Sequence, residues 1–279
     1  MSHHEHGVIS LGIDIGSTAT KAVVFTDHIL GQSMTPTGWD PKKAGLQVLN
    51  EALDAAGVQQ SQVGAIIGTG YGRISLPLFT RRVTEITCHA MGAHFLHSAT
   101  RTVIDIGGQD CKVIALDEEG EVTDFIMNDK CAAGTGRFLQ IMAAILDVSL
   151  DDLGTLASTA EPVALSSMCT VFAESEVTGL LARGVDKAGI AAGVIDTVAQ
   201  RIHALSGKVP LVDGVTFTGG MARNEQICHR IAHNLGTRLH VPANPQFVGA
   251  LGAALIGQDL LTSPSSRKGL RHDPSQNLC

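Results

Sequence analysis

Two cysteines stand ahead of segments with a helical pattern. Cys131 follows a short apolar run that ends at Asn128, and a turn of small residues and a helical pattern from Phe138 come after it. Cys169 likewise precedes a second helical stretch, from Phe172. Amide groups and the macrodipole at the start of a helix favour negative charge, and so favour a thiolate over a thiol. Both positions are therefore candidates for metal binding.

Two thiolates are too few for a closed site, because zinc and iron–sulfur centres usually take four protein ligands. A two-fold axis would supply the second pair from an identical subunit, so we expect a metal centre shared across a homodimer. The alternative is that both are ordinary core residues, since free cysteine is among the most buried residue types. The chain has no CxxC pair and no zinc-type spacing. We interpret the other four cysteines as core or tail: Cys88, Cys111, Cys228 and Cys279.

A strand–turn–strand unit occurs twice. Residues 13–21 read Ile-Asp-Ile-Gly-Ser-Thr-Ala-Thr-Lys, and residues 104–112 read Ile-Asp-Ile-Gly-Gly-Gln-Asp-Cys-Lys. Aspartate, glycine and lysine fall in the same places, and apolar runs flank both units. Such a repeat predicts a duplicated fold with two similar lobes. The first unit alone could be an ordinary hairpin with a polar turn, but two facing turns would hold a polyphosphate from both sides.

The residue types in these turns suit phosphate and metal. Bare amides and hydroxyls in the first turn can bind a phosphate, and Lys21 could reach one. Asp14 could hold a magnesium ion, directly or through water. The second turn carries Gln109, whose side chain can orient a water at a γ-phosphate. We therefore predict catalytic roles for Asp14, Asp105 and Gln109.

A third glycine turn follows a predicted strand at residues 212–217 and precedes a helix that ends at Leu235. At Gly219 and Gly220 a backbone without side chains could pass close to a base and ribose; a plain strand-to-helix turn is the alternative. The predicted nucleotide contacts are Gly16, Ser17, Thr18, Ala19, Thr20, Lys21, Gly107, Gly108, Gly219, Gly220, Asn224 and Gln246.

The remaining segments are typical of an α/β protein. A helix is predicted over residues 42–56, with Leu46, Leu49, Ala52 and Leu53 on one face. The glycine-rich loop at residues 68–73 is either a hinge or a simple turn. Cys88 and His89, in a predicted helix at residues 87–96, are interpreted as core. Further elements are expected at residues 63–67 (strand), 173–184, 187–207 and 245–254 (helices), and 239–241 (strand).

Composition and charge exclude several classes of function. The net charge is −7 and no basic run occurs, so nucleic acid is not an expected partner. No apolar run is long enough to span a membrane, and the N-terminus lacks the charged start and apolar stretch of a signal peptide. We interpret the protein as cytoplasmic, where cysteines stay reduced and more often bind metal or catalyse than form disulfides.

Together these motifs resemble a known superfamily. The two Asp-Gly turns, the turn at 218–220 and the Gly-Ala-Leu-Gly-Ala stretch at 249–253 are similar to those of actin, Hsp70 chaperones and sugar kinases. Two further motifs narrow the resemblance to one family within this superfamily. They are Asn-Asp-Lys-Cys-Ala-Ala-Gly-Thr-Gly-Arg-Phe at 128–138 and Met-Cys-Thr-Val-Phe-Ala-Glu-Ser-Glu at 168–176. They resemble the activators (component A) of 2-hydroxyacyl-CoA dehydratases in the BadF/BadG/BcrA/BcrD ATPase family. The resemblance covers about residues 8–258.

This resemblance implies a duplicated actin-like ATPase fold with ribonuclease H-like lobes and the nucleotide in the cleft. The expected division is an N-terminal lobe at 8–100, a C-terminal lobe at 101–258 and a polar tail at 259–279. The resemblance also implies a homodimer that binds one [4Fe-4S] cluster through Cys131 and Cys169 of each subunit. With ATP and Mg²⁺ it would deliver one electron to a dehydratase (component D), after receiving it from a donor such as ferredoxin or flavodoxin.

Three alternatives remain open at the level of sequence. The same family includes ATPase subunits of benzoyl-CoA reductases. A small-molecule kinase of the same fold would need a carboxylate base facing a substrate, and the sequence alone does not place one. A non-catalytic metal or redox sensor would use ATP only to set its conformation.

Overall fold

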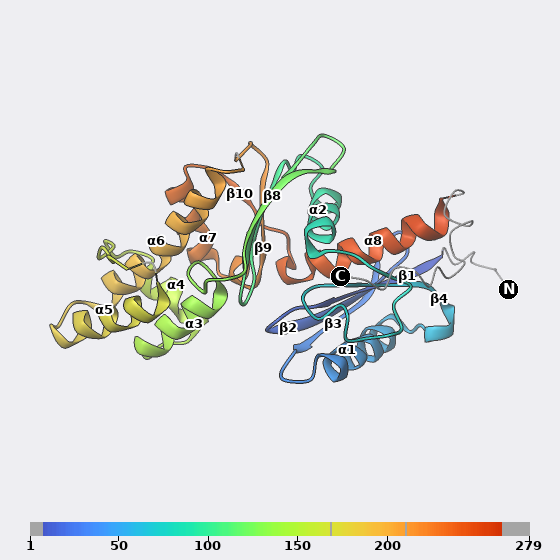
Figure 1. The fold of residues 1–279 in the computed structure, drawn as a ribbon, viewed down its shortest axis with the longest axis horizontal. Helices are drawn as coiled ribbons and strands as arrows, with labels where there is room; N and C mark the ends of the chain where they lie inside the picture. Colours follow the sequence, from blue (N-terminus) through green and yellow to red (C-terminus); the bar gives the residue numbers. More distant parts are fainter. Residues whose placement is uncertain (1–7, 168, 210, 264–279) are drawn as a thin grey trace.

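The chain folds into two lobes, each built on a five-stranded sheet (Figure 1). The computed structural model describes residues 8–167, 169–209 and 211–263. The first sheet has the order β3-β2-β1-β4-β5 and the second the order β10-β9-β6-β7-β8. If the second order is read backwards, β6 to β10 take the places of β1 to β5, so the predicted duplicated α/β fold is confirmed. The strands are β1 (Ile9–Ile15), β2 (Ala19–Phe25), β3 (Ile29–Pro36), β4 (Val63–Thr69), β5 (Arg81–Arg82), β6 (Thr102–Ile106), β7 (Cys111–Leu116), β8 (Val122–Asn128), β9 (Val215–Gly219) and β10 (Leu239–His240).

The strand register repeats between the lobes. In the antiparallel pair β1–β2, Asp14 is the partner of Lys21; in the pair β6–β7, Asp105 is the partner of Lys112. A parallel strand flanks the other side of each central strand, β4 beside β1 and β9 beside β6. Each lobe therefore places one aspartate near the end of a central strand with a lysine directly opposite it.

Helix α1 (Pro41–Ala56) covers one face of the first sheet, and the carboxylate of Asp40 caps its first turn. Its buried face differs from the predicted one, because Leu46 is partly exposed. The physical reason is a neighbouring loop, in which Leu76 packs against Gly45 and so brings that side of the helix inward. The buried residues of the helix are Ala44, Gly45, Val48, Leu49, Ala52 and Leu53.

The two lobes exchange helices. Helix α8 (Val248–Thr262) comes last in the described chain, yet it packs on the face of the first sheet opposite α1 (Figure 1). Helix α2 (Glu85–Leu96) comes from the N-terminal half, and its Ile86 and Ala90 join the core of the second sheet. The two helices cross closely, since a Cβ on Gly252 would overlap the backbone carbonyl of Cys88. The expected division at residues 100 and 101 therefore separates each helix from the sheet that it covers.

The end of the chain also differs from expectation. Helix α8 continues to Thr262, so a polar tail does not begin at residue 259. The apolar face that α8 lays on the first sheet keeps the chain helical beyond that point, because Leu260 still packs against the core. Cys279 and the N-terminal histidines lie outside the described residues.

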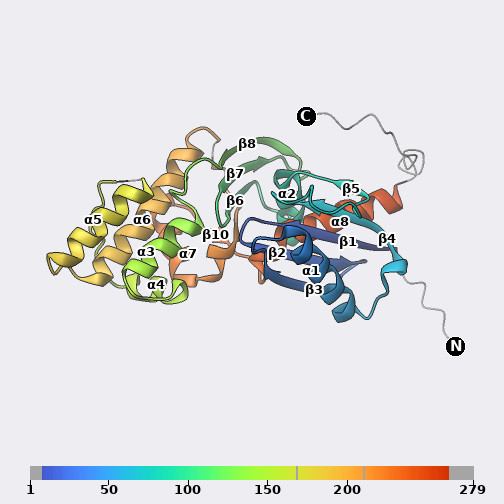
Figure 2. The same cartoon turned by 60° about the horizontal axis from the view of Figure 1, so that its bottom comes forward.

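Five more helices cover the second sheet on the face away from α2, as Figure 2 shows. Their core is built around Phe138, Leu139 and Phe217, all fully buried. Strand β9 begins at Val215, three residues after the predicted start. The helices are α3 (Gly136–Ile145), α4 (Leu150–Ala157), α5 (Thr170–Ala182), α6 (Lys187–Ser206) and α7 (Glu225–Leu235). Among helices of the described ranges, none has the length and apolar character to cross a bilayer.

Candidate functional site

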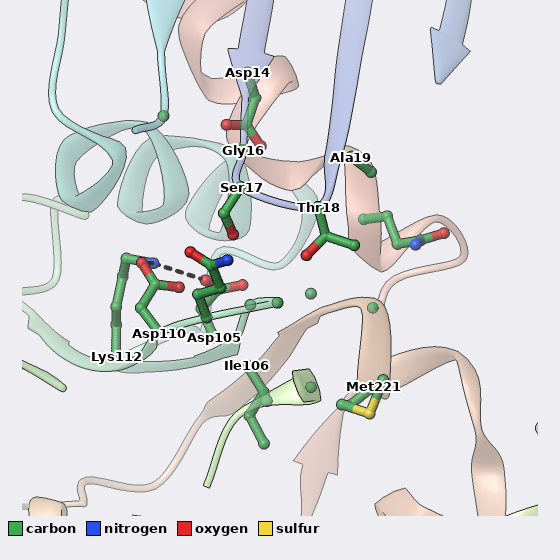
Figure 3. A pocket seen from close by; sticks show the side chains of 18 of the residues that line it. Asp14, Gly16, Ser17, Thr18, Ala19, Asp105, Ile106, Asp110, Lys112 and Met221 are labelled. Carbon is green, nitrogen blue, oxygen red and sulfur yellow. Dashed lines mark hydrogen bonds and ion pairs between the residues drawn. The ribbon is translucent and has the colours of Figure 1, made fainter. Parts of the chain in front are cut away.

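A cavity of about 470 Å³ lies between the two lobes. Both Asp-containing turns reach it, and Figure 3 shows them facing each other across the space. The approach is close, because a Cβ on Gly108 would overlap the hydroxyl of Thr18. Only a glycine leaves room for the first turn at this position. A molecule bound in the cavity would therefore contact both lobes at once.

The predicted catalytic and nucleotide-binding residues gather at this cavity, with one exception, whereas the predicted metal ligands Cys131 and Cys169 do not line it. The exception is Thr20, whose buried hydroxyl lies 2.9 Å from that of Thr37, behind the first turn. Thr37 in turn donates a hydrogen bond of 2.7 Å to the carbonyl of Gly16, so Thr20 supports the turn from within the lobe. The residues of the predicted set that line the cavity are Asp14, Gly16, Ser17, Thr18, Ala19, Lys21, Asp105, Gly107, Gly108, Gln109, Gly219, Gly220, Asn224 and Gln246.

The first turn carries a simple ion pair. Lys21 Nζ lies 3.3 Å from Asp14 Oδ2, and both side chains are mostly buried. The turn itself is closed by a hydrogen bond of 3.2 Å from the amide of Gly16 to the carbonyl of Ala19. The aspartate and the lysine come together because the hairpin register places them opposite each other.

The second turn has the same aspartate–lysine pair, but with additional polar and charged neighbours. Lys112 Nζ lies 3.2 Å from Asp105 Oδ2 and 2.8 Å from Asp110 Oδ2. The other oxygen of Asp105 accepts a hydrogen bond of 3.0 Å from the hydroxyl of Thr218 and lies 3.6 Å from His89 Nδ1. Asp105 and Lys112 are both almost fully buried. Residues from three other segments thus converge on the carboxylate of Asp105: Lys112, Thr218 and His89.

These contacts set the charge states. Burial opposes ionisation of Asp105, but His89, Lys112 and the Thr218 hydrogen bond outweigh it and hold its pKa below the ordinary value. Burial raises the pKa of Asp110, and the nearby Lys112 only partly offsets this effect. For Lys112, burial opposes the charge, yet the two carboxylates prevail and raise its pKa. Asp105 is therefore an ionised oxygen donor at neutral pH, which suits a hard cation such as Mg²⁺.

The glycine turn after β9 forms another wall of the cavity. Gly219 has φ +90°, and a Cβ there would overlap the carbonyl of Ile106, so this position requires glycine. Asn224 lines the cavity, but its side chain already has partners. Its oxygen accepts from the amide of Ile227 (3.1 Å), which caps α7, and its nitrogen donates to the carbonyl of Asp151 (2.8 Å). Its amide therefore holds α7 and α4 together.

The glycine-rich loop at residues 68–73 packs against the first turn. The amide of Gly72 donates a hydrogen bond of 2.8 Å to the carbonyl of Ile15. Arg73 Nη1 donates to the carbonyl of Gly70 (3.0 Å) and lies 3.3 Å from Glu85 at the start of α2. The loop thus ties the first turn to the helix that enters the other lobe.

The five cysteines of the described residues divide into two groups. Cys88, Cys111 and Cys228 are buried, and burial raises the pKa of these thiols to about 12, 11 and 11. Cys131 is half-buried and Cys169 is exposed. Cys169 is the N-cap residue of α5, whereas Cys131 lies in a loop that ends at Thr135, the N-cap of α3. In the described part of one chain, no three potential metal ligands gather.

The family follows from a match over nearly the whole chain. Residues 11–257 match the BadF/BadG/BcrA/BcrD ATPase family. The chain belongs to this family. The match includes both lobes, the three glycine turns and the two exposed or half-buried cysteines, so all parts of the site described above lie inside it.

Three proteins of known name are similar to this chain over most of its length. The (R)-2-hydroxyglutaryl-CoA dehydratase activating ATPase of Acidaminococcus fermentans is 44% identical, over 89% of this chain and 96% of its own. The activator of the 2-hydroxyisocaproyl-CoA dehydratase from Clostridium difficile, solved with bound ADPNP, is 38% identical with a TM-score of 0.86 and covers 95% and 99% of the two chains. A benzoyl-CoA reductase subunit from Thauera aromatica is 34% identical over 89% and 93%.

Several polar residues at the cavity of this ATPase-family chain were not predicted from the sequence. His89 was interpreted as core; it is buried, but its ring faces Asp105 and Thr218. Glu85 and His89 both line the cavity and are four residues apart on α2, so a polar stripe on this helix was the available signal. Asp110 and Lys112 lie within the second copy of the repeated unit, but the sequence pattern assigns no specific role to either.

Proposed function

We propose that this chain is an ATP-dependent activator of a 2-hydroxyacyl-CoA dehydratase. In this proposal it works as a homodimer that couples ATP hydrolysis to the transfer of one electron to its partner enzyme. The observation that carries the proposal is the pairing, in one chain, of the two-turn cavity with two accessible cysteines, Cys131 and Cys169. Two relatives of this chain at 38–44% identity are named as activators of such dehydratases.

The nucleotide is proposed to lie between the two turns. The cavity reaches both Asp14 and Asp105, whose carboxylates are suitable ligands for the Mg²⁺ that accompanies ATP. Lys21 and Lys112 supply positive charge toward the phosphates, and Gln109 would orient the attacking water. A relative with the same fold was solved with the ATP analogue ADPNP, which supports a nucleotide role for this cavity.

The residues present also suit an iron–sulfur cluster. Thiolates are the usual ligands of such clusters, and a [4Fe-4S] cluster takes four of them. One chain offers Cys131 and Cys169, on segments that lead into α3 and α5, two helices whose apolar faces share one core. Two copies would therefore provide four ligands. When bound, the cluster would supply a carrier for a single electron.

An exposed apolar pair beside Cys169 supports the homodimer. Val171 and Phe172, in the first turn of α5, are 68% and 66% exposed. Apolar side chains gathered next to a metal-binding position are more consistent with contact to another protein surface than with solvent. A second copy related by a two-fold axis would cover them while it completes the cluster.

The energy scale makes such coupling feasible. A tenfold change in a one-electron equilibrium corresponds to about 59 mV, or about 1.4 kcal/mol. Closure of the lobes around ATP that contributes a few kcal/mol would shift the potential by roughly one to two hundred millivolts. An upstream donor such as ferredoxin or flavodoxin would reload the protein after each transfer.

The test begins with protein purified without oxygen. We expect a broad visible absorption that dithionite bleaches, about two irons per chain because four are shared by two subunits, and dimeric size. Cys131→Ser and Cys169→Ser should each abolish the iron content, whereas Cys228→Ser should keep it. Full iron in either ligand variant, or four irons in a monomer, would contradict the proposal.

A second candidate is an ATPase subunit of a benzoyl-CoA reductase, which the 34% identity to the Thauera aromatica protein favours. Both candidates use the same cavity and the same cysteines, so the iron content cannot separate them. The loaded protein is therefore added to a purified 2-hydroxyacyl-CoA dehydratase and, in parallel, to a benzoyl-CoA reductase that lacks its own ATPase subunits. Only the true partner should turn over when ATP is supplied.

A further inference from the structure

We propose that residues 128–137 form a rigid connection that links the second turn to Cys131, with Asn128 as its positioning residue. This inference rests on the proposed function, since it takes the cavity as the nucleotide site and Cys131 as a cluster ligand. It adds that the two cysteines of one chain respond unequally to the nucleotide. Cys131 is the coupled ligand, whereas no hydrogen bond of the described residues joins Cys169 directly to the second turn.

The first part of the connection joins the second turn to α3. The amide of Gly136 donates to the carbonyl of Gly107 (2.9 Å), and the amide of Arg137 donates to that of Gly108 (2.8 Å). The first amides of a helix have no partner within the helix, and here the backbone of the second turn accepts from two of them. A displacement of Gly107 and Gly108 by a bound phosphate is therefore passed directly to the start of α3.

The second part fixes the loop that carries Cys131. Asn128 is buried at the end of β8, and its Nδ2 donates to the carbonyls of Cys131 (2.8 Å) and Ala133 (3.1 Å). Both hydrogens of the amide group are thereby used. The carbonyl between them, that of Ala132, accepts from the amide (3.0 Å) and the hydroxyl (2.7 Å) of Thr135. All three consecutive carbonyls are engaged, so the loop moves as one piece with α3.

The loop that carries Cys131 also packs against helix α6, and its first anchor, Asn128, pairs with strand β7. Gly134 has φ +83°, and a Cβ there would meet the side chain of Arg201 on α6 at 2.7 Å. Asn128 lies opposite Cys111 in the β7–β8 register, and its Nδ2 is 3.9 Å from the sulfur of that buried cysteine. With the sheet on one side and α6 on the other, the loop has little room for independent motion.

The segment before Cys169 is held differently. The amides of Ser166 and Ser167 donate to the carboxylate of Glu176 at 2.8 and 3.0 Å, and the hydroxyl of Ser166 donates to it at 2.9 Å. Glu176 lies on α5 itself, so these contacts tie the segment to its own helix. No backbone hydrogen bond of the described residues links this segment to either turn of the cavity. The response of Cys169 to the nucleotide can therefore be compared, within the same chain, with the response of Cys131.

The experiment measures thiol reactivity and iron release in the full chain. Iron is removed with a chelator under anaerobic conditions, and iodoacetamide labelling of Cys131 and Cys169 is followed by peptide mass spectrometry, with and without Mg-ADPNP. We expect the nucleotide to change the labelling rate of Cys131 by about fivefold, the lower end of typical coupling between two sites, and that of Cys169 by much less. In the iron-loaded protein, the rate of bleaching by the chelator should change in the same way.

Two variants test the connection. Asn128→Ala should retain ADPNP affinity but lose the nucleotide effect at Cys131, because the carbonyls of the loop are released from the sheet. Gly136→Ala adds a Cβ 3.1 Å from the carbonyl of Gly107 and should weaken the effect without touching Asn128. Gly179→Ala in α5, where a Cβ meets nothing within 4 Å, and Asn234→Ala on the exposed side of α7 are the matched controls and should respond like the parent.

The outcomes separate this inference from the proposed function. If ADPNP does not bind the parent chain, the proposed function itself is wrong. If ADPNP binds and iron loads, but Cys131 and Cys169 respond equally, the connection is wrong. If Asn128→Ala keeps the nucleotide effect, Asn128 is not its positioning residue. Should that variant fail to fold, as judged by its melting curve and ADPNP affinity, Gly136→Ala decides: an unchanged response overturns the connection.

Discussion

The two Asp-Gly turns have similar sequences but different supports. In the first lobe, Thr37 holds the turn: its amide donates to the carbonyl of Thr18 (3.0 Å) and its hydroxyl to that of Gly16. In the second lobe, the carbonyls of Gly107 and Gly108 accept instead from the start of α3. Both turns have the same register. The first turn reaches helix α2 indirectly, through the glycine-rich loop, whereas the second accepts hydrogen bonds directly from the first amides of α3.

The difference begins in the connection that follows the third strand of each unit. Four residues, 37–40, separate β3 from α1, whereas seven, 129–135, separate β8 from α3. The longer connection contains Cys131. A loop of this length can lie between the sheet and the helix and still be fixed by hydrogen bonds at each end. Under the proposed function, the second lobe would therefore combine nucleotide contact and metal binding, whereas the first would contact only the nucleotide.

The largest expected effect of this asymmetry is at the aspartates. Asp105→Asn should lower ATP turnover by about 10²–10³-fold, the usual result when a group aimed at transition-state charge is lost. Asp14→Asn should also lower turnover but should destabilise the fold less, because its lysine has more access to solvent. Steady-state ATPase rates and thermal melting of both variants measure this. Turnover like that of the parent in both would show that the site is wrongly assigned.

The lysines give the next largest difference. Lys112→Met leaves Asp105 and Asp110 close together without their shared cation, and breaking a buried pair in this way typically costs about 3–5 kcal/mol. Lys21→Met leaves a single carboxylate, that of Asp14, without its cation, and should therefore lower the unfolding free energy clearly less than Lys112→Met does. Urea unfolding of the two variants tests this. Equal losses of unfolding free energy would mean that the two turns are equivalent after all.

A smaller effect separates chemistry from binding. Gln109 and Thr18 occupy the same place in the two units. Gln109→Ala should slow turnover about tenfold at unchanged nucleotide affinity, because positioning a water acts only on the chemical step. Thr18→Ala should weaken ADPNP binding instead. Titration of ADPNP together with single-turnover hydrolysis distinguishes the two, and a loss of affinity in Gln109→Ala would contradict the assigned role.

The smallest effect should appear only in acid. The folded pKa of Asp105 is lowered from 3.8, so its ionised form stabilises the fold above roughly pH 4 and this contribution is lost as pH falls further; each pKa unit is about 1.4 kcal/mol. The difference in unfolding free energy between the parent and Asp105→Asn should therefore shrink as pH is lowered below that value. A difference that stays constant into acid would argue that Asp105 is not held ionised by its neighbours.

The local features of this protein could be predicted from its sequence. The alternation of apolar residues and the polar turns set both hairpins, and a hairpin register necessarily places Asp14 opposite Lys21 and Asp105 opposite Lys112. Interactions over a few residues decide such features. The repeat then implied two lobes and a cavity between them, because a second copy of the same unit must fold in the same way.

Predictions that needed a specific packing partner were less complete. Leu46 fits the helical pattern of α1, yet Leu76 from a distant loop decides which side of that helix is buried. His89 looked like a core residue because the residues directly beside it in the sequence are small or apolar. Its partners, Asp105 and Thr218, are 16 and 129 residues away, and only the fold brings them to it.

The sequence by itself determined the repeated lobes, the facing turns and the two cysteine-bearing segments, since each depends on residues close together along the chain. Only the tertiary structure decided that α8 returns to the first sheet, that α2 joins the second, and that α3 begins on the carbonyls of Gly107 and Gly108. The physical reason is that these contacts join segments far apart along the chain. Apolar side chains pack α2 and α8 on their sheets, and Gly252 lets the two helices approach. The start of α3 is held by backbone hydrogen bonds. A backbone amide or carbonyl is the same in every residue, so its partner follows from where the whole chain has placed it.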